Sequence, residues 1–272
     1  MYAPQVNIAL RAARRAGEFL RRHVDDARHI AVEQKGHNDF VTQVDRACEA
    51  LIIDTLQRSY PDHSFLAEES GLVEGKGDDA RWQWIIDPLD GTTNFIHGLP
   101  QFAVSIALAK DGRVEHAVVY DPMREEEFTA SRGRGAMLNG RRLRMPKRNG
   151  LEGTLIGTGF PFRPEQMQHL DAYLGMFRDM VQSTAGIRRA GSAALDLAWV
   201  AAGRLDGFWE YGLQSWDIAA GALLITEAGG LVSDFTGGHR FLDSGNIVAA
   251  TPKVFKAMLQ TIQPHLTDGL KR

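Results

Sequence analysis

The sequence predicts an α/β protein with an α+β first half, residues 1–148, and an α/β second half, residues 149–272. Two stretches with apolar residues at helical spacing open the chain, and several short runs of strand type follow them. Beyond residue 154, strand and helix patterns alternate, which is typical of an α/β layer. A basic, glycine-ended stretch at residues 147–150 marks the boundary between the halves.

Composition excludes several classes of protein. The chain has 272 residues, 31 Lys and Arg against 34 Asp and Glu, 44% hydrophobic residues and one cysteine. These values fit a globular protein of one large or two ordinary domains and exclude a disulfide framework or a multi-cysteine metal site. The longest stretch without charged side chains, residues 91–109, is interrupted by polar residues and proline. We therefore expect a cytoplasmic protein with no membrane partner.

The first 60 residues predict two helices. Apolar residues recur at helical spacing from Val6 to Leu20 and again from Val44 to Leu56, and residues 36–39 break the pattern between them. Cys48 lies on the second apolar stripe, so we expect it in the core rather than as a nucleophile.

Strands follow from Phe65 onwards. Residues 82–86 form a compact apolar run, and residues 102–109 and 114–120 flank an Asp-Gly turn, as in a hairpin. Residues 127–130 and 136–143 continue an antiparallel set.

The second half alternates its elements along the chain. We expect strands at 154–157, 207–211, 231–235 and 247–249, and helices at 166–182, 192–202, 216–228 and from Pro252 onwards. Glycines at 203 and 229–230 end two of these helices.

The segment 87–94, DPLDGTTN, follows an apolar strand and carries the strongest chemical signal. Pro88 makes the strand exit rigid, and Asp87 and Asp90 lie close together beyond it. Gly91 and the residues after it can turn backbone N–H groups toward an anion. Carboxylates beside a phosphate need a bridging cation, and Mg²⁺ combines these two kinds of ligand. The alternative is an ordinary Asp-Pro turn with a helix cap.

Three further acidic positions are weak signals when each is taken alone. Glu68 and Glu69 follow a short apolar strand and could form a solvated turn. Asp217 lies in the first turn of a helix, where it could simply cap that helix or offset its dipole. Asp45 could be an exposed first-turn helix residue.

Together these segments resemble the inositol monophosphatase family of Mg²⁺-dependent phosphatases, in the family's order and over nearly the whole chain. The matching segments are 38–45 (NDFVTQVD), 68–70 (EES), 84–95 (WIIDPLDGTTNF), 191–196 (GSAALD) and 216–221 (WDIAAG). The flanking sequence is similar to a bacterial subgroup of this family. The resemblance implies a layered α/β/α/β/α sandwich, shared with fructose-bisphosphatases, and a homodimer.

The resemblance also implies a site that holds two or three Mg²⁺ ions. Asp87 would bridge two ions, and Asp45 with the Thr92 hydroxyl would orient and deprotonate the attacking water. In-line attack by this water would leave no covalent enzyme intermediate. The implied metal ligands are Glu68, Asp87, the Leu89 carbonyl, Asp90 and Asp217, and the implied catalytic residues are Asp45, Glu68 and Thr92.

The same resemblance assigns substrate contacts. The Gly91 and Thr92 amides would bind phosphate, and Ala193 and Glu210 would face the hydroxyls of the leaving group. Arg188 stands where the bacterial subgroup has a substrate-contacting arginine. The full implied set is Leu89, Asp90, Gly91, Thr92, Arg188, Ala193, Glu210 and Asp217. The loop before Asp217 lacks a histidine that many members carry, so selectivity for inositol over other polyols stays open.

The implied activity is Mg²⁺-dependent, lithium-sensitive hydrolysis of inositol 1-phosphate or a similar sugar or polyol phosphate. A fructose-1,6-bisphosphatase-like enzyme is one alternative. The other is a regulatory binding protein with vestigial activity, because the bacterial subgroup is linked to RNA polymerase, to antitermination factors of the NusA type and to ribosomal RNA synthesis. Basic residues on the first helix and at 141–148 could then contact RNA or protein, or could simply be solvated.

Overall fold

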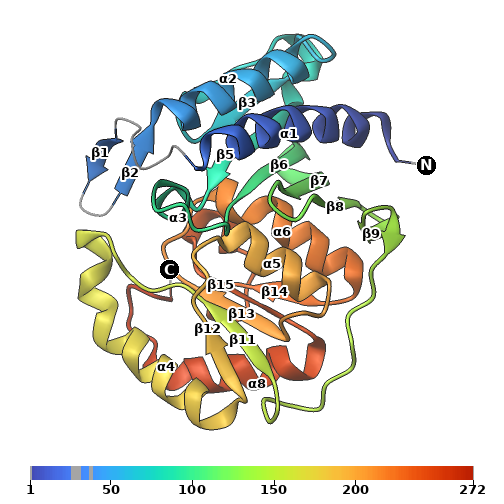
Figure 1. Ribbon diagram of the computed structural model, residues 1–272. Helices are drawn as coiled ribbons and strands as arrows, with labels where there is room; N and C mark the ends of the chain where they lie inside the picture. The colour runs from blue at the N-terminus through green and yellow to red at the C-terminus, as the bar shows by residue number, and fades with distance from the viewer. Residues whose placement is uncertain (1, 26–31, 37–38, 272) are drawn as a thin grey trace.

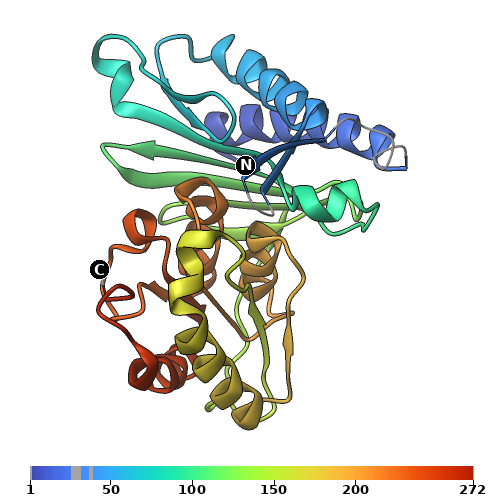
Figure 2. The same cartoon turned by 90° about the vertical axis from the view of Figure 1, so that its left-hand side faces the viewer.

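The computed structural model describes residues 2–25, 32–36 and 39–271, and it shows alternating layers of helix and sheet (Figures 1 and 2). Helices α1 and α2 cover one face of an eight-stranded sheet, and α5 and α6 cover its other face. A five-stranded sheet lies on the far side of α5 and α6, with α4 and α8 outside it. The predicted α/β/α/β/α sandwich is confirmed.

The outer helices are α1 (Pro4–His23) and α2 (Gln43–Gln57), as the apolar spacing predicted. Small alanines on the buried face of α1 allow close packing, and Pro4 starts the helix without losing a hydrogen bond. Cys48 is fully buried, with its Sγ 3.7 Å from the Ala16 carbonyl oxygen. The helical pattern does break at Gly36 and Asp39, which belong to a short antiparallel pair that was not predicted, β1 (Val32–Gly36) and β2 (Asp39–Thr42). Residues 37 and 38 lie outside the described residues.

The eight-stranded sheet has the order β10-β9-β8-β7-β6-β5-β3-β4 and is antiparallel except where β3 meets β5. A short 3₁₀ helix, Gly77–Arg81, precedes β5. The strands are β3 (Ser64–Ala67), β4 (Gly71–Val73), β5 (Trp82–Asp90), β6 (Ala103–Lys110), β7 (Arg113–Asp121), β8 (Glu126–Ser131), β9 (Gly135–Leu138) and β10 (Arg141–Arg142).

Two turns of this sheet show what the sequence did and did not predict. The β6–β7 hairpin turns at Asp111 and Gly112, with φ of 50° and 76°, as expected of an Asp-Gly pair. The single strand expected over 136–143 is wrong. Asn139 and Gly140 have φ of 47° and 76°, and this left-handed pair turns the chain back as the separate strand β10.

The five-stranded sheet has the order β12-β11-β13-β15-β14. The helix expected over 166–182 begins with a 3₁₀ helix, Pro164–His169, before α4, and strand β12 was not predicted. The remaining elements are β11 (Leu155–Thr158), α4 (Leu170–Ser183), β12 (Gly186–Arg188), α5 (Ala193–Ala201), β13 (Gly207–Glu210), α6 (Ser215–Ala228), β14 (Leu231–Ser233), α7 (Phe241–Ser244), β15 (Ile247–Ala250), α8 (Pro252–Ile262) and a 3₁₀ helix, Gln263–His265.

The central helices α5 and α6 are apolar nearly all round because sheets cover both of their sides. One hydrophobic cluster joins Phe128 of the first sheet to Leu197 and Ile218 of these helices and to Ile247 of the second sheet. The two halves therefore share a core, although the two sheets divide between Arg142 and Leu155. No described helix combines the length and the apolar character needed to cross a membrane.

Candidate active site

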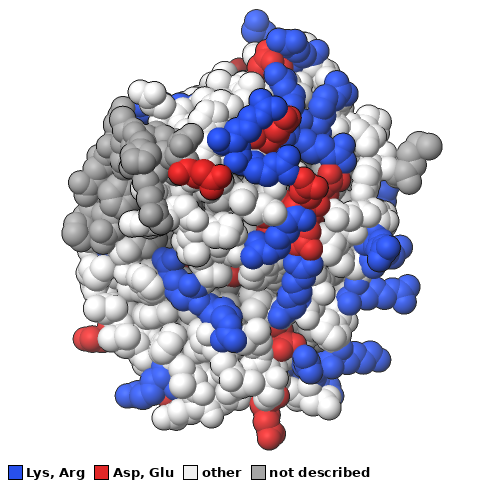
Figure 3. All heavy atoms as spheres, in the orientation of Figure 1, with Lys and Arg blue, Asp and Glu red and all other residues white. Residues whose placement is uncertain are grey.

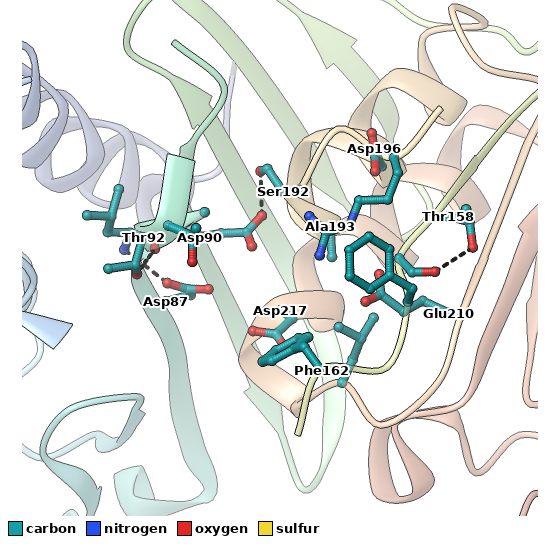
Figure 4. Close-up of a pocket in the computed structure, with 18 of the residues that line it drawn as sticks. Asp87, Asp90, Thr92, Thr158, Phe162, Ser192, Ala193, Asp196, Glu210 and Asp217 are labelled. Atoms are coloured by element: carbon teal, nitrogen blue, oxygen red, sulfur yellow. Dashed lines mark hydrogen bonds between the residues drawn. The ribbon is translucent and has the colours of Figure 1, made fainter. Parts of the chain in front are cut away.

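A pocket of about 500 Å³ opens between the two halves, where β5 ends and α5 and α6 begin (Figure 4). Segments far apart in the sequence line it together. Its lining comprises Glu68, Asp87, residues 89–93 and His97 from the first half, and residues 158–160, 162, 163, 189, 191–193, 196, 210, 213 and 217 from the second. The structure thus brings together acidic positions that are separate in the sequence.

The end of β5 places two carboxylates in this pocket. Asp87 is 2% exposed, and its Oδ1 accepts a hydrogen bond of 2.9 Å from the Leu89 amide. Asp90 reaches across to the second half, where its Oδ2 accepts bonds from the Ser192 hydroxyl (2.6 Å) and the Ala194 amide (2.7 Å). The start of α5 therefore orients Asp90.

Gly91 follows at φ 102°, and the short helix α3 (Thr92–Ile96) begins directly after it. A Cβ at this position would lie 3.0 Å from the Gln101 carbonyl and 3.2 Å from the Gly191 carbonyl, so both conformation and space require glycine. The glycine lets the β5 exit approach the loop that carries Ser192.

Thr92 links the β5 exit to α2. Its hydroxyl lies 3.0 Å from Oδ1 of Asp45 and 3.1 Å from the Leu89 carbonyl oxygen, and it can donate its one proton to only one of them at a time. Asp45 is fully buried, so the exposed first-turn position considered for it is wrong. A buried carboxylate within reach of a pocket hydroxyl is suited to orienting a water and accepting its proton.

Asp217 both caps α6 and lines the pocket. Its Oδ2 accepts a 2.7 Å bond from the Gln214 amide in a capping box. Glu68 follows β3, and its own amide donates to the Ile86 carbonyl beside β5 at 3.2 Å. The next two amides, of Glu69 and Ser70, donate to the buried carboxylate of Glu49 on α2 at 2.8 and 2.9 Å.

The pocket carboxyls have raised pKa values. Burial raises the pKa of Asp87 and of Asp217 well above the ordinary value, and neighbouring carboxylates raise both further. Burial also raises the pKa of Asp90 to about 6, against the lowering effect of its bond from Ser192. These acids are close enough to destabilise each other's charge, which is the environment a bound cation relieves.

The chemistry of the pocket suits a hard cation. Its acidic side chains offer oxygen donors, which suit Mg²⁺ rather than zinc or copper. Within the described ranges, no three Asp, Glu, His or Cys side chains already converge as a finished metal site. Mg²⁺ does not require three, because it usually keeps waters and takes one or two carboxylates together with substrate phosphate.

The predicted substrate contacts divide into two groups. Ala193 and Glu210 line the pocket on the side opposite Asp87. The other contacts that line it are Leu89, Asp90, Gly91, Thr92 and Asp217. Arg188 does not line it. This side chain is exposed and donates to the Ile187 carbonyl at 3.0 Å, whereas the neighbouring Arg189 lines the pocket and stacks on Phe160 at 4.2 Å.

Sequence reasoning missed several lining residues, among them Arg163, Phe160, Phe162 and Asp196. The phenylalanines belong to a Gly-Phe-Pro-Phe segment at 159–162, and only the pairing of β11 with β13 brings it beside Glu210. The one available signal was Asp196 within the GSAALD segment, an acid on an otherwise apolar helix.

The model of the inositol monophosphatase family matches residues 1–267. The chain belongs to the inositol monophosphatase family.

Individual relatives of this inositol monophosphatase family member carry two kinds of name. The chain is 63% identical to the "Nus factor SuhB" of Pseudomonas aeruginosa, with 99% of each chain covered. The crystal structure of extragenic suppressor protein suhB from Bartonella henselae matches with a TM-score of 0.92 and 43% identity, covering 97% of this chain and 100% of that one. Inositol monophosphatase from Anabaena matches with a TM-score of 0.80 and 36% identity, covering 95% and 94%. The similarity to the bacterial subgroup noted in the sequence is confirmed.

Proposed function

We propose that this protein is a Mg²⁺-dependent phosphomonoesterase that hydrolyses inositol 1-phosphate or a similar sugar or polyol phosphate. One observation carries the proposal: four acidic side chains from distant segments, Glu68, Asp87, Asp90 and Asp217, line one pocket beside the Thr92–Asp45 pair. Family membership supports a phosphatase, and the all-oxygen ligand set supports Mg²⁺.

Glu68, Asp87, Asp90, Asp217 and the Leu89 carbonyl would hold two or three Mg²⁺ ions, with Asp87 shared between two. When bound, the ions would neutralise the phosphate, lower the pKa of water and stabilise the attacking and leaving oxygens. The Gly91 and Thr92 amides would bind the phosphate oxygens at the turn into α3.

The chain's own residues would carry the proton transfer. The Thr92 hydroxyl would orient a water for in-line attack on phosphorus, and Asp45 would accept the proton that this water loses. Ala193 and Glu210 would hold hydroxyls of the leaving polyol on the opposite side of the pocket. Attack by water would transfer the phosphoryl group directly, without a covalent enzyme intermediate.

The test is phosphate release from inositol 1-phosphate, measured for wild type and Asp87→Asn in Mg²⁺ and in EDTA. We expect release only by wild type in Mg²⁺, with inhibition by lithium, and slower release from fructose 1,6-bisphosphate. Equal rates in all four conditions would overturn the proposal. Faster release from the bisphosphate would favour the fructose-1,6-bisphosphatase-like alternative.

We propose transcription antitermination as a second role, favoured by the name "Nus factor SuhB" that the relative at 63% identity carries. Its partners would be RNA polymerase and antitermination factors of the NusA type. Most basic side chains of α1 are neutralised, because Arg14, Arg21 and Arg22 pair with Glu127, Glu125 and Glu18. Figure 3 shows blue and red side chains intermingled over the upper part of the surface, where Figure 1 places α1.

Arg141, Arg142 and Arg144 are also exposed, and in the part of the chain that the structure describes they form no ion pair. They are therefore the better candidates for contact with RNA or an acidic protein surface. Reversing the charge of Arg141 and Arg142 should weaken capture of the transcription complex while phosphate release is unchanged. Unchanged capture would remove this patch from the proposal.

We propose that the implied homodimer uses the exposed apolar side of α4. Leu170, Leu174 and Val181 recur at helical spacing there and are 36%, 50% and 49% exposed. A contiguous apolar stripe of this kind is typical of an interaction surface. Leu174→Glu should convert a dimer to a monomer in sedimentation equilibrium, and an unchanged mass would exclude this face.

A further inference from the structure

Asp196 is a buried acid for which the proposed phosphatase mechanism has no use. It lies in α5, is 1% exposed and lines the pocket at the end away from Asp87 (Figure 4). Its Oδ1 has no hydrogen-bond partner among the described residues. Buried polar atoms are nearly always paired, so an unpaired carboxyl oxygen at a pocket wall indicates a group that a ligand completes.

Helix capping does not account for this side chain. Ser192 already caps α5, since its hydroxyl oxygen accepts a bond from the Leu195 amide at 3.4 Å. The Asp90 carboxylate accepts from the Ala194 amide at the same helix start. The free donors of the first turn are thus served by other groups.

The end of strand β11 that faces Asp196 and Glu210 carries two glycines. Gly157 and Gly159 flank Thr158 at the end of β11, so they lie on one face of the extended chain. A Cβ at Gly159 would overlap the Glu210 carboxylate, 1.9 Å from its carbon, so glycine leaves room for that side chain. A Cβ at Gly157 would meet Leu205 at 2.9 Å and would lie in ordinary contact, 3.6 Å, with the Asp196 carboxyl carbon. The two carboxyl groups therefore lie beside successive positions on one face of the same strand.

These two carboxyl groups interact. Burial raises the pKa of Asp196 well above its ordinary value, and Glu210 is the first neighbouring charge that raises it further. The positive charge of Arg189, which stacks on Phe160, lowers the pKa of both acids. Two adjacent carboxyls can together accept from, or donate to, two adjacent hydroxyls.

We propose that Asp196 is a specificity-determining residue that acts with Glu210 to bind neighbouring hydroxyls of the polyol leaving group. This inference rests on the proposed phosphatase function and names its substrate class, a phosphomonoester of a vicinal polyol. Asp196 contacts the leaving group only, and it takes no part in activating the water.

The test compares two substrates that differ only in hydroxyl groups, inositol 1-phosphate and cyclohexyl phosphate, with wild type, Asp196→Ala and Asp196→Asn. Loss of hydrogen bonds to the polyol should lower kcat/KM of Asp196→Ala for inositol 1-phosphate about tenfold. The value for cyclohexyl phosphate should stay within about twofold, because that ring has no hydroxyl to bind. Asp196→Asn keeps one acceptor and should fall between these results.

Asp206→Asn is the matched control. Asp206 is also a buried aspartate, 4% exposed, but it accepts from the Arg148 guanidinium and the Leu155 amide away from the pocket. It should lose stability without changing the ratio of the two substrates.

Each outcome decides one question. A parallel fall for both substrates in the Asp196 variants, or no change for either, would overturn the inference and leave the phosphatase function standing. Failure of wild type to hydrolyse either substrate in Mg²⁺ would overturn the proposed function, and this inference with it. Asp196→Asn keeps the test valid if Asp196→Ala does not fold.

Discussion

Buried carboxylates occupy two different settings in this molecule. In the loops outside the pocket they are saturated: Asp121, which is fully buried, accepts bonds from the Met123 amide, the Arg124 amide and the Arg124 guanidinium at 2.8 to 3.0 Å. In the pocket, Asp87 has one amide donor and three acidic neighbours. The protein itself satisfies the Asp121 carboxylate, whereas Asp87 lies among like charges that a cation or a substrate would relieve.

This difference predicts that pocket acids serve activity and loop acids serve stability. Sites that bind charged ligands are commonly less stable than an optimised core would be. The variants below set one acid of each kind against the other.

The largest effect on activity is expected for Asp90→Asn. The amide oxygen of asparagine can still accept hydrogen bonds from Ser192 and Ala194, but the negative charge proposed to hold Mg²⁺ is lost. Phosphate release should fall roughly a thousandfold, about 4 kcal/mol of transition-state stabilisation. The melting temperature in EDTA should not fall, because burial disfavours the charged form that the variant lacks. A stable variant with full activity would refute the assignment of pocket acids to activity and loop acids to stability.

Glu210→Gln should show how much a buried negative charge in the pocket lowers the free energy of unfolding at each pH. Burial raises the pKa of Glu210 from 4.5 to about 8, so the folded state holds this proton more tightly than the unfolded state. Wild type therefore loses the contribution of Glu210 to stability as pH rises from about 4.5 to about 8. The variant lacks this contribution, while the other buried acids titrate in both proteins. The gap in free energy of unfolding between the variant and wild type, measured in EDTA, should widen by up to about 5 kcal/mol over this range and then level off. A gap that is constant with pH would contradict the prediction.

The sequence predicted the acidic residues of the pocket better than the residues that lie beside them. The segments holding Asp87 and Asp217 could be read because strand exits and helix starts have local signatures. The pocket position of Arg189 instead of Arg188 could not be read, since adjacent residues of an extended segment point to opposite sides and β12 was not predicted. Asp196 was part of a recognised motif, but its place in the pocket wall depends on the packing of α5 against β11 and β13, which no local pattern contains.

For the fold as well, features with a local signature were predicted and contacts between distant segments were not. Helices α1, α2, α6 and α8 were predicted because their apolar spacing or their caps are local. The β9–β10 turn was missed although Asn139-Gly140 is a strong hairpin signal. The two strands pair over two residues on each side of the turn, which is too short a stretch to show an alternating pattern. Sheet order and the sharing of one core between the halves depend on contacts that no local pattern contains.

Asp234→Ala tests a saturated loop acid. The Asp234 carboxylate accepts from the Thr236 amide and hydroxyl and from the Gly238 and Arg240 amides. Burial raises its pKa, but these donors outweigh burial and lower it, so its stabilisation exists above pH 4 and fades as pH falls below that. The variant should lose about 2 kcal/mol in urea unfolding at pH 7 and keep its kcat within about twofold. Loss of activity without loss of stability would place Asp234 in the wrong group.

Glu49→Gln is expected to have the smallest effect and lies at the border between the two groups. The Glu49 carboxylate is saturated like a loop acid, but its donors are the amides of Glu69 and Ser70, next to the proposed ligand Glu68. The amide of glutamine keeps one acceptor oxygen and loses the other, so the turn should loosen without unfolding. Stability should fall by about 1 kcal/mol, while the Mg²⁺ concentration for half-maximal activity rises severalfold and kcat at saturating Mg²⁺ is nearly unchanged. Asp121→Asn, whose carboxylate holds a turn with no proposed ligand beside it, should lose stability without that shift in Mg²⁺ dependence. If both variants shift it equally, loosening any loop weakens the site, and the position of Glu49 has no special meaning.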